Sequence, residues 1–325
     1  MAQLKKNAIQ MLKDLITAQK AEPSASSGFK IKAFQQGITA INKLDGALPK
    51  TKKDLVKIKG IGKGIAERIL ELIDSGTVEE WEEVKENHDI TALDVLTSVL
   101  GIGNALAKKL IEDGIETIED LKTAVDKEKV KLTTAQSLGL KYYKALQRRI
   151  PREEVQSLRT YLVQRLKTID KNIKLEIAGS YRRRSKDCGD VDVLIYHPNI
   201  TTVEEANESD ILKRFVEDLE EKNIMIRVSL GSTKYMGLAN WPRDSKKIAH
   251  TDIRFVPAES YISALAYFTG SRENNIEMRK QALKLGYKLN EYGLFIVKDD
   301  SRVPLESEKQ LYELLDMKYL TPSNR

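Results

Sequence analysis

The sequence predicts an α+β protein in which an all-helical N-terminal region precedes a β-sheet domain and a smaller region of mixed helices and strands. Three observations indicate this architecture. Apolar side chains recur at helical spacing over residues 4–20. A Gly-Ile-Gly pattern occurs twice before residue 110. Apolar runs of strand length, rich in Val and Ile, occupy residues 174–196 and 224–256.

Composition excludes several classes of protein. With 325 residues, 41% apolar and 31% charged, the chain predicts a globular protein of two or more domains. No apolar run reaches the roughly 18 residues of a membrane span, and no secretory leader is evident. The single cysteine, Cys188, excludes an internal disulfide, and its place beside Gly189 favours a turn residue over a reactive thiol. We therefore expect an intracellular protein that is not secreted and does not contact a membrane.

Positive charge is concentrated near the N-terminus. The net charge is +6, but residues 1–60 hold 12 lysines against 4 acidic residues. A positively charged surface in this region could bind the phosphate backbone of a nucleic acid. Lysines on a helix face that is simply exposed to solvent explain the charge equally well. We predict helices over residues 4–20 and 29–44, joined by a linker at 22–28 and followed by a break at 46–49.

A forty-one-residue internal repeat follows these helices. Gly60-Ile61-Gly62 returns as Gly101-Ile102-Gly103, each copy lying between an apolar segment and a predicted helix. This pattern predicts two helix-hairpin-helix motifs, because glycines allow a tight turn and bring backbone N–H groups close to a phosphate. A glycine offers no side-chain contact, so this mode of binding recognises the nucleic-acid backbone rather than its sequence.

The rest of the chain alternates helices with strands. Pro151 is suited to the first turn of a helix that reaches about residue 168. The remaining predicted elements are a strand–turn–strand at 174–196, a charged helix at 201–222, strands at 224–228, 231–237 and 248–256, a helical region at 260–285 interrupted at 267–271, short strands between 286 and 320, and a helix at 307–315.

Three carboxylates mark the candidate site. Asp190 and Asp192 are two residues apart in a strand and therefore share one face, where they repel each other unless a cation lies between them. Asp252 lies within the strand 248–256, where a carboxylate is costly unless it is paired. A lone Asp-x-Asp segment is usually a pair of exposed surface residues without a functional role. Here the Asp190-Val191-Asp192 segment runs into a β-branched strand, and hydrogen-bond donors precede it at Ser180 and Arg182–Arg184. Together these features indicate a metal ion beside a phosphate-binding turn. That combination is typical of nucleotidyl transfer.

The segment Gly179-Ser180-Tyr181-Arg182-Arg183, followed by Gly189-Asp190-Val191-Asp192, resembles the nucleotidyltransferase superfamily. In its longer form it resembles the family X DNA polymerases, most closely their beta member. The resemblance covers essentially the whole chain. It implies a lyase-like 5′-phosphate-binding domain at 1–86, a DNA-binding subdomain at 87–148, a catalytic palm at 149–256 and a nascent-base-pair-binding subdomain at 257–325.

The resemblance also implies specific ligands. Asp190 and Asp192 would bridge two Mg²⁺ ions, for which Mn²⁺ could substitute, while Asp252 would bind one of them. The implied nucleotide contacts are Arg149, Ser180, Arg183, Gly189, Tyr267, Phe268, Gly270, Arg272 and Asn275. The implied DNA contacts are Lys30, Gly60, Gly62, Lys63, Gly101, Gly103, Lys234, Arg254 and Arg279. Main-chain carbonyls of Val56, Ile58 and Ile61, and of Thr97, Val99 and Ile102, would each hold a Na⁺ or K⁺ ion.

Further family features concern conformation and partners. Arg254, Glu291 and Tyr292 match a switch that responds to closure of the C-terminal subdomain. The implied substrates are a deoxynucleoside triphosphate and gapped or nicked duplex DNA with a 5′-phosphate. We expect a monomeric repair polymerase, nuclear in a eukaryotic cell or cytoplasmic if it is viral. We expect no recruitment domain before the first helix, so repair partners, which the sequence does not identify, would bind other surfaces.

Three positions depart from the family pattern. Arg68 stands where the beta member has the lysine that forms a Schiff base with 5′-deoxyribose phosphate. A guanidinium offers no free amine, so lyase activity is expected to be weak or lost unless Lys63, or Lys59 or Lys30, replaces it. Arg272 replaces an acidic residue beside the incoming base, and we expect it to stack on that base. The hairpin near 297–304 is shortened.

Three alternatives stay open at this point. An RNA-directed nucleotidyltransferase is disfavoured by the paired hairpins and by the Tyr267-Phe268-Thr269-Gly270 segment. A template-independent terminal transferase is disfavoured because no long insertion separates the strands between 228 and 248. A catalytically idle DNA-binding module would lack a metal carboxylate, and all three carboxylates are present. The sequence does not predict fidelity, processivity or the degree of template independence.

Overall fold

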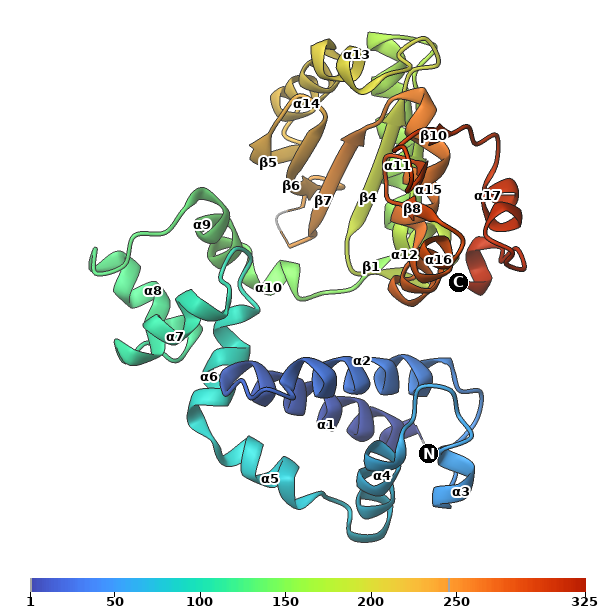
Figure 1. Ribbon diagram of the computed structural model, residues 1–325. Coiled ribbons are helices and arrows are strands. Elements are labelled where there is room, and N and C mark those ends of the chain that lie inside the picture. The colour runs from blue at the N-terminus through green and yellow to red at the C-terminus, as the bar shows by residue number, and fades with distance from the viewer. Residues whose placement is uncertain (1, 245) are drawn as a thin grey trace. The chain divides into compact units, whose positions relative to one another are not determined.

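The computed structural model describes residues 2–244 and 246–325 (Figure 1). The chain divides into two compact units, Met1–Lys141 and Tyr142–Arg325. The first unit is helical and the second contains every strand of the described residues, so the α+β prediction is confirmed. None of the helices in these residues combines the length and apolar character that crossing a membrane requires.

The first unit is built from nine helices in the part of the chain that the structure describes. They are α1 (Ala2–Ala21), α2 (Ser27–Lys43), α3 (Lys52–Leu55), α4 (Lys63–Ser75), α5 (Glu79–Glu86), α6 (His88–Thr97), α7 (Asn104–Glu112), α8 (Ile118–Asp126) and α9 (Thr134–Lys141). The apolar stripe of α1, including Met11, Leu12 and Leu15, is fully buried against α2 and α4. Both helices predicted at the N-terminus are confirmed.

The two glycine hairpins have the same backbone structure. One joins α3 to α4 and the other joins α6 to α7. Gly60 and Gly101 adopt positive φ angles of 104° and 83°, which favour glycine. The N–H of Ile61 donates to the carbonyl of Ile58 at 3.0 Å, and the N–H of Ile102 donates to that of Val99 at 3.0 Å. The repeat predicted from the sequence is therefore a repeat of conformation as well.

The second unit is organised around a five-stranded sheet of order β2-β4-β7-β6-β5. Its strands are β2 (Lys174–Ile177), β4 (Val191–Tyr196), β5 (Met225–Leu230), β6 (Lys234–Asn240) and β7 (Ile248–Phe255). All neighbours are antiparallel except β4 and β7, which run parallel. Apolar residues of α11 (Arg152–Ile169) and α14 (Ile211–Glu221) cover one face of the sheet, where Val191, Val193 and Ile195 are buried.

The opposite face of the sheet meets the C-terminal region. Leu194 and Ala178 pack against Ala264 and Leu265 of α15 (Tyr261–Thr269). The region has its own small core, which includes the fully buried Tyr312. Its elements are η1 (Ala258–Ser260), α15, α16 (Arg272–Lys284), β8 (Tyr287–Leu289), β9 (Leu294–Ile296), β10 (Arg302–Val303), α17 (Glu308–Leu314) and η2 (Pro322–Asn324).

Short elements connect these parts, and two of them differ from the prediction. The helix expected over 201–222 is two helices, α13 (Val203–Glu208) and α14, because the chain becomes extended at Ser209. The turn after β2 is a short helix, α12 (Gly179–Arg182). The remaining elements are α10 (Tyr143–Leu146), β1 (Ile150–Pro151) and β3 (Asp187–Cys188).

Candidate active site

The central pair of the site is Asp192 on β4 and Asp252 on β7. These residues are direct partners in the parallel register of the two strands, which puts their side chains on the same face of the sheet. Asp190 immediately precedes β4 and is exposed, whereas Asp192 and Asp252 are half-buried. Two strands distant in the sequence therefore bring the three predicted carboxylates into one neighbourhood.

The negative charges of these carboxylates affect the pKa of Asp192. Burial, together with the charges of Asp190 and Asp252, raises the pKa of Asp192 to about 7, while the guanidinium groups of Arg183 and Arg254 oppose that rise. In residues 2–244 and 246–325, Oδ1 of Asp252 is buried and has no hydrogen-bond partner. Buried carboxylate oxygens normally have a donor or a cation beside them. The set is thus acidic, partly desolvated and short of positive charge.

This donor set fits divalent magnesium. Mg²⁺ prefers carboxylate oxygens, and it is usually bound by one or two carboxylates together with substrate phosphates rather than by an all-protein cage. Among the described residues, no three His, Cys, Asp or Glu side chains are close enough together to hold a metal ion by themselves. Asp190, Asp192 and Asp252 are the carboxylates that could hold such an ion, with substrate oxygens completing its coordination.

A tight turn lies directly beside Asp192. Gly179, the first residue of α12, has a φ of 53°, and a Cβ atom there would lie 2.6 Å from Oδ2 of Asp192. Only glycine therefore lets this backbone approach the carboxylate so closely. Arg183 follows α12 and donates from Nη1 to the carbonyl of Thr269 at 2.6 Å, which holds the guanidinium at the junction with α15.

One cavity of about 850 Å³ collects most of the predicted site. Its lining includes Asp190 and Asp192 and also all nine residues predicted to bind the nucleotide. These nine are Arg149, Ser180, Arg183, Gly189, Tyr267, Phe268, Gly270, Arg272 and Asn275. Asp192 of β4, the residues just before that strand and α12 contribute to the lining, and α15 and α16 contribute the rest. This volume is typical of a small-molecule site.

The α15–α16 side is internally braced. Nδ2 of Asn275 donates to the carbonyl of Tyr267 at 2.7 Å. The guanidinium of Arg279 lies 5.0 Å from the centre of the Tyr267 ring and 3.6 Å from the carboxylate of Glu291. Tyr267, Asn275 and Arg279, which all line the cavity, are thus held together, and Glu291 fixes Arg279 from outside the cavity lining.

The predicted switch residues line a second, smaller cavity of about 50 Å³. Arg254, Glu291 and Tyr292 all face it. The guanidinium of Arg254 lies 5.4 Å from the centre of the Phe268 ring, and its Nε is buried without a partner among the described residues. Lys234, a predicted DNA contact, is opposite Arg254 in the register of β6 and β7 and does not line either cavity.

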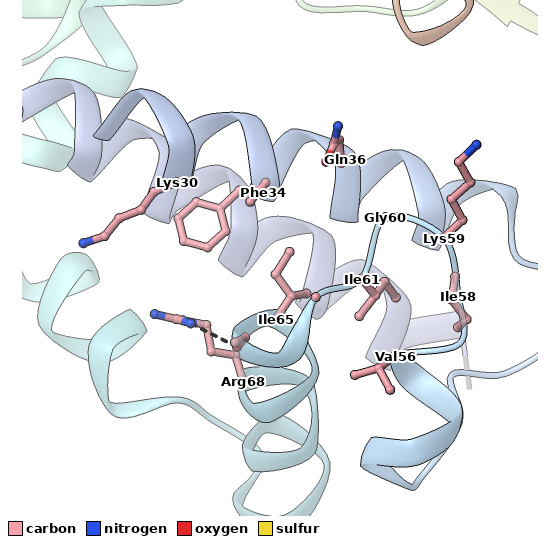
Figure 2. A pocket seen from close by; sticks show the side chains of 13 residues that line it. Lys30, Phe34, Gln36, Val56, Ile58, Lys59, Gly60, Ile61, Ile65 and Arg68 are labelled. Carbon is pink, nitrogen blue, oxygen red and sulfur yellow. Dashed lines mark hydrogen bonds between the residues drawn. The ribbon is translucent and has the colours of Figure 1, made fainter. Parts of the chain in front are cut away.

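The first hairpin forms a pocket of about 530 Å³ in the helical unit (Figure 2). Lys30 of α2 and Lys59 of the hairpin lie on opposite sides of it, and Gly60 and Gly62 line the wall between them. Lys63 begins α4 and is exposed but is not among the lining residues. The ammonium groups of Lys30 and Lys59 point away from each other in Figure 2, and the rest of the lining is largely apolar, with Phe34, Ile61 and Ile65 among its residues.

Arg68 lies in the same pocket and is held on three sides. Its Nε donates to Glu80 at 2.8 Å and Nη2 donates to the same carboxylate, while Nη1 donates to the carbonyl of Gly64 at 3.0 Å. Its guanidinium lies 5.6 Å from the centre of the Phe34 ring. Sequence reasoning identified Arg68 but not Glu80, since nothing in the sequence pairs two residues twelve apart on separate helices.

Residues named as cation ligands lie at equivalent places in the two hairpins. Ile58 and Ile61 match Val99 and Ile102 through the hydrogen bonds described above, and Val56 and Thr97 end the preceding helices. The carbonyls of Ile58 and Val99 each accept one hydrogen bond, which leaves each a second lone pair. Gly103 has an extended conformation like that of Gly62 and precedes α7 as Gly62 precedes α4.

Family models match four consecutive segments of the chain. A helix-hairpin-helix domain matches residues 4–78, the fingers domain of DNA polymerase lambda matches 94–147, the DNA polymerase beta palm matches 149–258 and the DNA polymerase beta thumb matches 264–325. The chain belongs to the family X DNA polymerases. The resemblance expected from the Gly-Ser-x-Arg-Arg and Asp-x-Asp segments is confirmed.

Curated relatives within family X extend this finding. The chain is 30% identical to DNA polymerase lambda of Arabidopsis thaliana over 292 residues, 83% of this chain and 53% of that protein. It is 26% identical to DNA polymerase lambda of Rattus norvegicus over 289 residues, 84% of this chain and 48% of that one. It is also 26% identical to the DNA polymerase/3′-5′ exonuclease PolX of Bacillus subtilis (strain 168) over 330 residues, 99% of this chain and 55% of that one. The chain thus spans about half the length of these relatives.

In this family X chain, some site residues were outside the sequence-based prediction. Ile276 lines the main cavity beside Asn275, and Glu308 with Arg325 braces Arg182 at the edge of the site. Cys188 is buried and burial raises the pKa of its thiol, which agrees with a structural rather than a reactive residue.

Proposed function

We propose that this chain is a template-directed DNA polymerase that fills short gaps, adding a deoxynucleotide to a primer 3′-hydroxyl and releasing pyrophosphate. The observation that carries this proposal is that Asp192, the register partner of Asp252, lines with Asp190 the same cavity as the nine predicted nucleotide contacts, while Asp252 itself is not among the lining residues. Family membership supports the same activity.

In the proposed reaction, the carboxylates would bind the metal ions and the turn at α12 would bind the phosphates. Asp190, Asp192 and Asp252 would hold two Mg²⁺ or Mn²⁺ ions, which when bound neutralise phosphate charge and promote ionisation of a hydroxyl. Ser180, Arg183, Gly189 and Arg149 would hold the β- and γ-phosphates. Oδ1 of Asp252, which is buried and has no hydrogen-bond partner among the described residues, would accept the proton of the primer hydroxyl once substrate is bound. Phosphoryl transfer needs mainly positioning and charge compensation, which these side chains supply.

The α15–α16 side would select the nucleotide. Tyr267, Phe268 and Gly270 would face the sugar and leave no room for a 2′-hydroxyl, which gives a preference for deoxynucleotides. Asn275, whose amide already donates to the carbonyl of Tyr267, would face the minor-groove edge of the base. Arg279 would contact the template strand, and Arg272 would stack on the incoming base.

The remaining contacts would hold DNA. The hairpin glycines Gly60, Gly62, Gly101 and Gly103 would bring backbone N–H groups against phosphates, with Na⁺ or K⁺ held by hairpin carbonyls. Lys30 and Lys63 would bind a 5′-phosphate, and Lys234 would contact the primer–template duplex. Arg254 would change partners between Asp192 and the Glu291–Tyr292 turn as the C-terminal region closes. The proposed working form is a monomer that acts in base-excision-type repair, in the nucleus if the source is a eukaryotic cell and in the cytoplasm if it is viral.

The first hairpin pocket would bind a 5′-phosphate without efficient lyase chemistry. Arg68 occupies the position expected for the nucleophile, and it is held by Glu80 and the Gly64 carbonyl. A guanidinium stays protonated at all ordinary pH values and cannot form a Schiff base. We therefore propose that 5′-deoxyribose phosphate is bound here and is removed slowly or not at all.

Primer extension on DNA with a one-nucleotide gap tests the proposal. The same primer and template are used as an open template–primer and as a gap, with and without a 5′-phosphate on the downstream strand. We expect template-directed incorporation with a strong preference for the phosphorylated gap. Incorporation that ignores the template, or that requires an RNA substrate, would favour one of the other nucleotidyltransferases.

A further inference from the structure

Arg149 is held by one residue, Asp187, through two different acceptors. Its Nε donates to Oδ1 of Asp187 at 2.8 Å, and its Nη2 lies 2.7 Å from the same oxygen. Nη2 also donates to the main-chain carbonyl of Asp187 at 3.1 Å. All three contacts are made along the Nε–Nη2 edge of the guanidinium. Because the guanidinium is planar and rigid, contacts along one edge fix the direction in which its remaining nitrogen points.

A short two-stranded ribbon brings these two residues together. Arg149 directly precedes β1, and Asp187 begins β3. The two strands pair antiparallel with Ile150 opposite Cys188, so the same register puts Arg149 opposite Gly189. Ile150 and Cys188 are both buried in the core of the sheet domain, which anchors the ribbon. The backbone therefore sets the position of Arg149 relative to the strand that carries the metal-binding carboxylates.

The other side of the guanidinium is left for a ligand. Nη1 of Arg149 has no hydrogen-bond partner among the described residues. It lies 3.0 Å from the position that a Cβ atom at Gly189 would occupy. Arg149 and Gly189 both line the main cavity, whereas Asp187 does not. Asp187 thus holds the guanidinium from outside the cavity, and Nη1 stays available to an anion inside it.

Exposure indicates which part of the nucleotide Arg149 would meet. Its side chain is 59% exposed, whereas Arg183, the other arginine proposed to bind phosphate, is half-buried. In the proposed reaction the metal ions hold the reacting phosphate beside Asp190 and Asp192, and the rest of the triphosphate extends away from them. The more exposed arginine suits the far end of that tail, which is the terminal phosphate.

We infer that Asp187 is a positioning residue that presents Arg149 to the terminal phosphate and thereby sets the preference for a nucleoside triphosphate over a diphosphate. The inference rests on the proposed function, because it takes Arg149 as a phosphate ligand. Asp187 itself touches neither the nucleotide nor the metal ions. An arginine that is already oriented loses less conformational entropy on binding, so its contact with the phosphate is stronger.

Calorimetric titration of the full chain with dATP and dADP tests the inference. The protein is bound to one-nucleotide-gapped DNA whose dideoxy-terminated primer prevents incorporation. Asp187→Ala removes the acceptor and is expected to weaken dATP binding about 3- to 10-fold and dADP binding by less than about 2-fold. Asp187→Asn keeps an oxygen acceptor and should bind dATP within about 2-fold of wild type. Asp210→Ala, which breaks an exposed ion pair with Arg214, is the control and should change neither affinity.

A double-mutant cycle shows whether Asp187 acts through Arg149. In the Arg149→Ala background, Asp187→Ala should weaken dATP binding no further. In single-turnover extension with a normal primer, Asp187→Ala alone should lower the apparent dATP affinity and leave the maximal rate within about 2-fold of wild type.

Two results would overturn the inference. Asp187→Ala could bind dATP as tightly as wild type or more tightly, which would make the carboxylate a competitor of the phosphate. It could also weaken dATP and dADP equally, or weaken dATP further without Arg149, which would indicate general damage to the site. Failure of the polymerase proposal is distinct, because the wild-type protein would then incorporate no nucleotide on the gapped DNA.

Discussion

Asp192 and Asp252 face each other across the parallel strands β4 and β7, as Cα partners in the sheet register. Their side chains share one face, and Asp252 retains a buried oxygen with no hydrogen-bond partner in residues 2–244 and 246–325. This pair is the geometric centre of the candidate site, and its chemistry and its cost to stability can be tested separately.

Replacement of Asp252 should abolish nucleotide incorporation without preventing DNA binding. Asp252→Asn keeps the size of the side chain but removes the charge and the acceptor for the primer proton. We expect the single-turnover incorporation rate to fall by on the order of 10³-fold, while affinity for gapped DNA changes by less than about 2-fold. Retention of more than a tenth of the wild-type rate would remove Asp252 from the catalytic set.

Asp192 should destabilise the metal-free protein at neutral and alkaline pH. Its pKa in the folded protein is about 7, above the ordinary value of 3.8, so its ionisation costs stability as the pH rises from about 4 to 7. In EDTA at pH 8, Asp192→Asn should increase the free energy of unfolding by about 1–3 kcal/mol, a rise of several degrees in Tm. The gain should shrink as the pH is lowered.

Calorimetry at several pH values measures this effect. Asp300→Asn is the control, because Asp300 is exposed and pairs only with Lys288 at the surface, where an ion pair contributes little. Added Mg²⁺ should raise the Tm of the wild-type protein and not that of Asp192→Asn. A lower Tm for Asp192→Asn in EDTA would show that the carboxylate is not under electrostatic stress.

Arg68 and Glu80 should both contribute to the absence of lyase chemistry in the hairpin pocket. In Arg68→Lys the new amine would lie beside Glu80, whose carboxylate raises an amine's pKa and keeps it protonated. Borohydride trapping on incised abasic DNA should therefore stay low for wild type and for Arg68→Lys, and should rise at least about 10-fold for Arg68→Lys combined with Glu80→Gln. Efficient wild-type trapping that is lost on Lys63→Ala would instead identify Lys63 as a nucleophile.

Glu308 should be important for stability. Its carboxylate accepts from Nη2 of Arg182 at 2.7 Å and from Nη1 of Arg325 at 2.6 Å, and all three side chains are largely buried. Glu308→Gln leaves two buried guanidinium groups without a counter-charge, so we expect a loss of about 2–4 kcal/mol in urea unfolding. Glu313→Gln, which touches only the exposed ion pair with Lys309, should cost less than about 0.5 kcal/mol.

The same carboxylate predicts acid sensitivity. Burial raises the pKa of Glu308, but the hydrogen bonds and charges of Arg182 and Arg325 outweigh that effect and hold the pKa below its usual value. Its contribution to stability is therefore complete above the unfolded-state pKa of about 4.5 and is lost as the pH falls through the folded-state value. Between pH 6 and pH 3, the wild-type protein should lose more stability than Glu308→Gln does.

Arg272 should strengthen binding of the incoming nucleotide. It begins α16 and lines the main cavity together with Asn275 and Arg279. Arg272→Asp should weaken the apparent affinity for the nucleotide about 10-fold or more in single-turnover extension, because it removes a delocalised cation and adds repulsion toward the triphosphate. An unchanged affinity with a reduced rate would assign Arg272 to the chemical step instead.

Local patterns in the sequence were sufficient for much of the fold. The apolar stripe of residues 4–20, the duplicated glycines and the alternation around Asp192 each predicted an element that the structure contains. The helix expected over 201–222 was wrong in one respect, since Ser209 interrupts a periodicity that continues through it. Hydrophobic periodicity does not register such a break when both halves bury the same face.

Contacts between distant elements were beyond local reasoning. The pairing of Asp192 with Asp252 depends on β4 and β7 being parallel neighbours, which is a property of sheet order. The pairing of Arg68 with Glu80 and of Glu308 with Arg325 depends on how helices and chain ends pack. Strand spacing indicated the three carboxylates and the family resemblance implied the nucleotide contacts, but neither predicted these side-chain partners, which depend on packing between distant elements.

The parallel β4–β7 pairing also dictates when a functional centre can exist during synthesis. A ribosome-bound chain that has released β4 carries Asp190 and Asp192 but lacks their opposite number, because the strand bearing Asp252 is among the last of the sheet to emerge. Nascent or prematurely terminated chains ending before residue 248 thus carry hairpins suited to gripping DNA while lacking the complete acidic set. If the proposed function is correct, such fragments would bind gapped DNA without filling the gap.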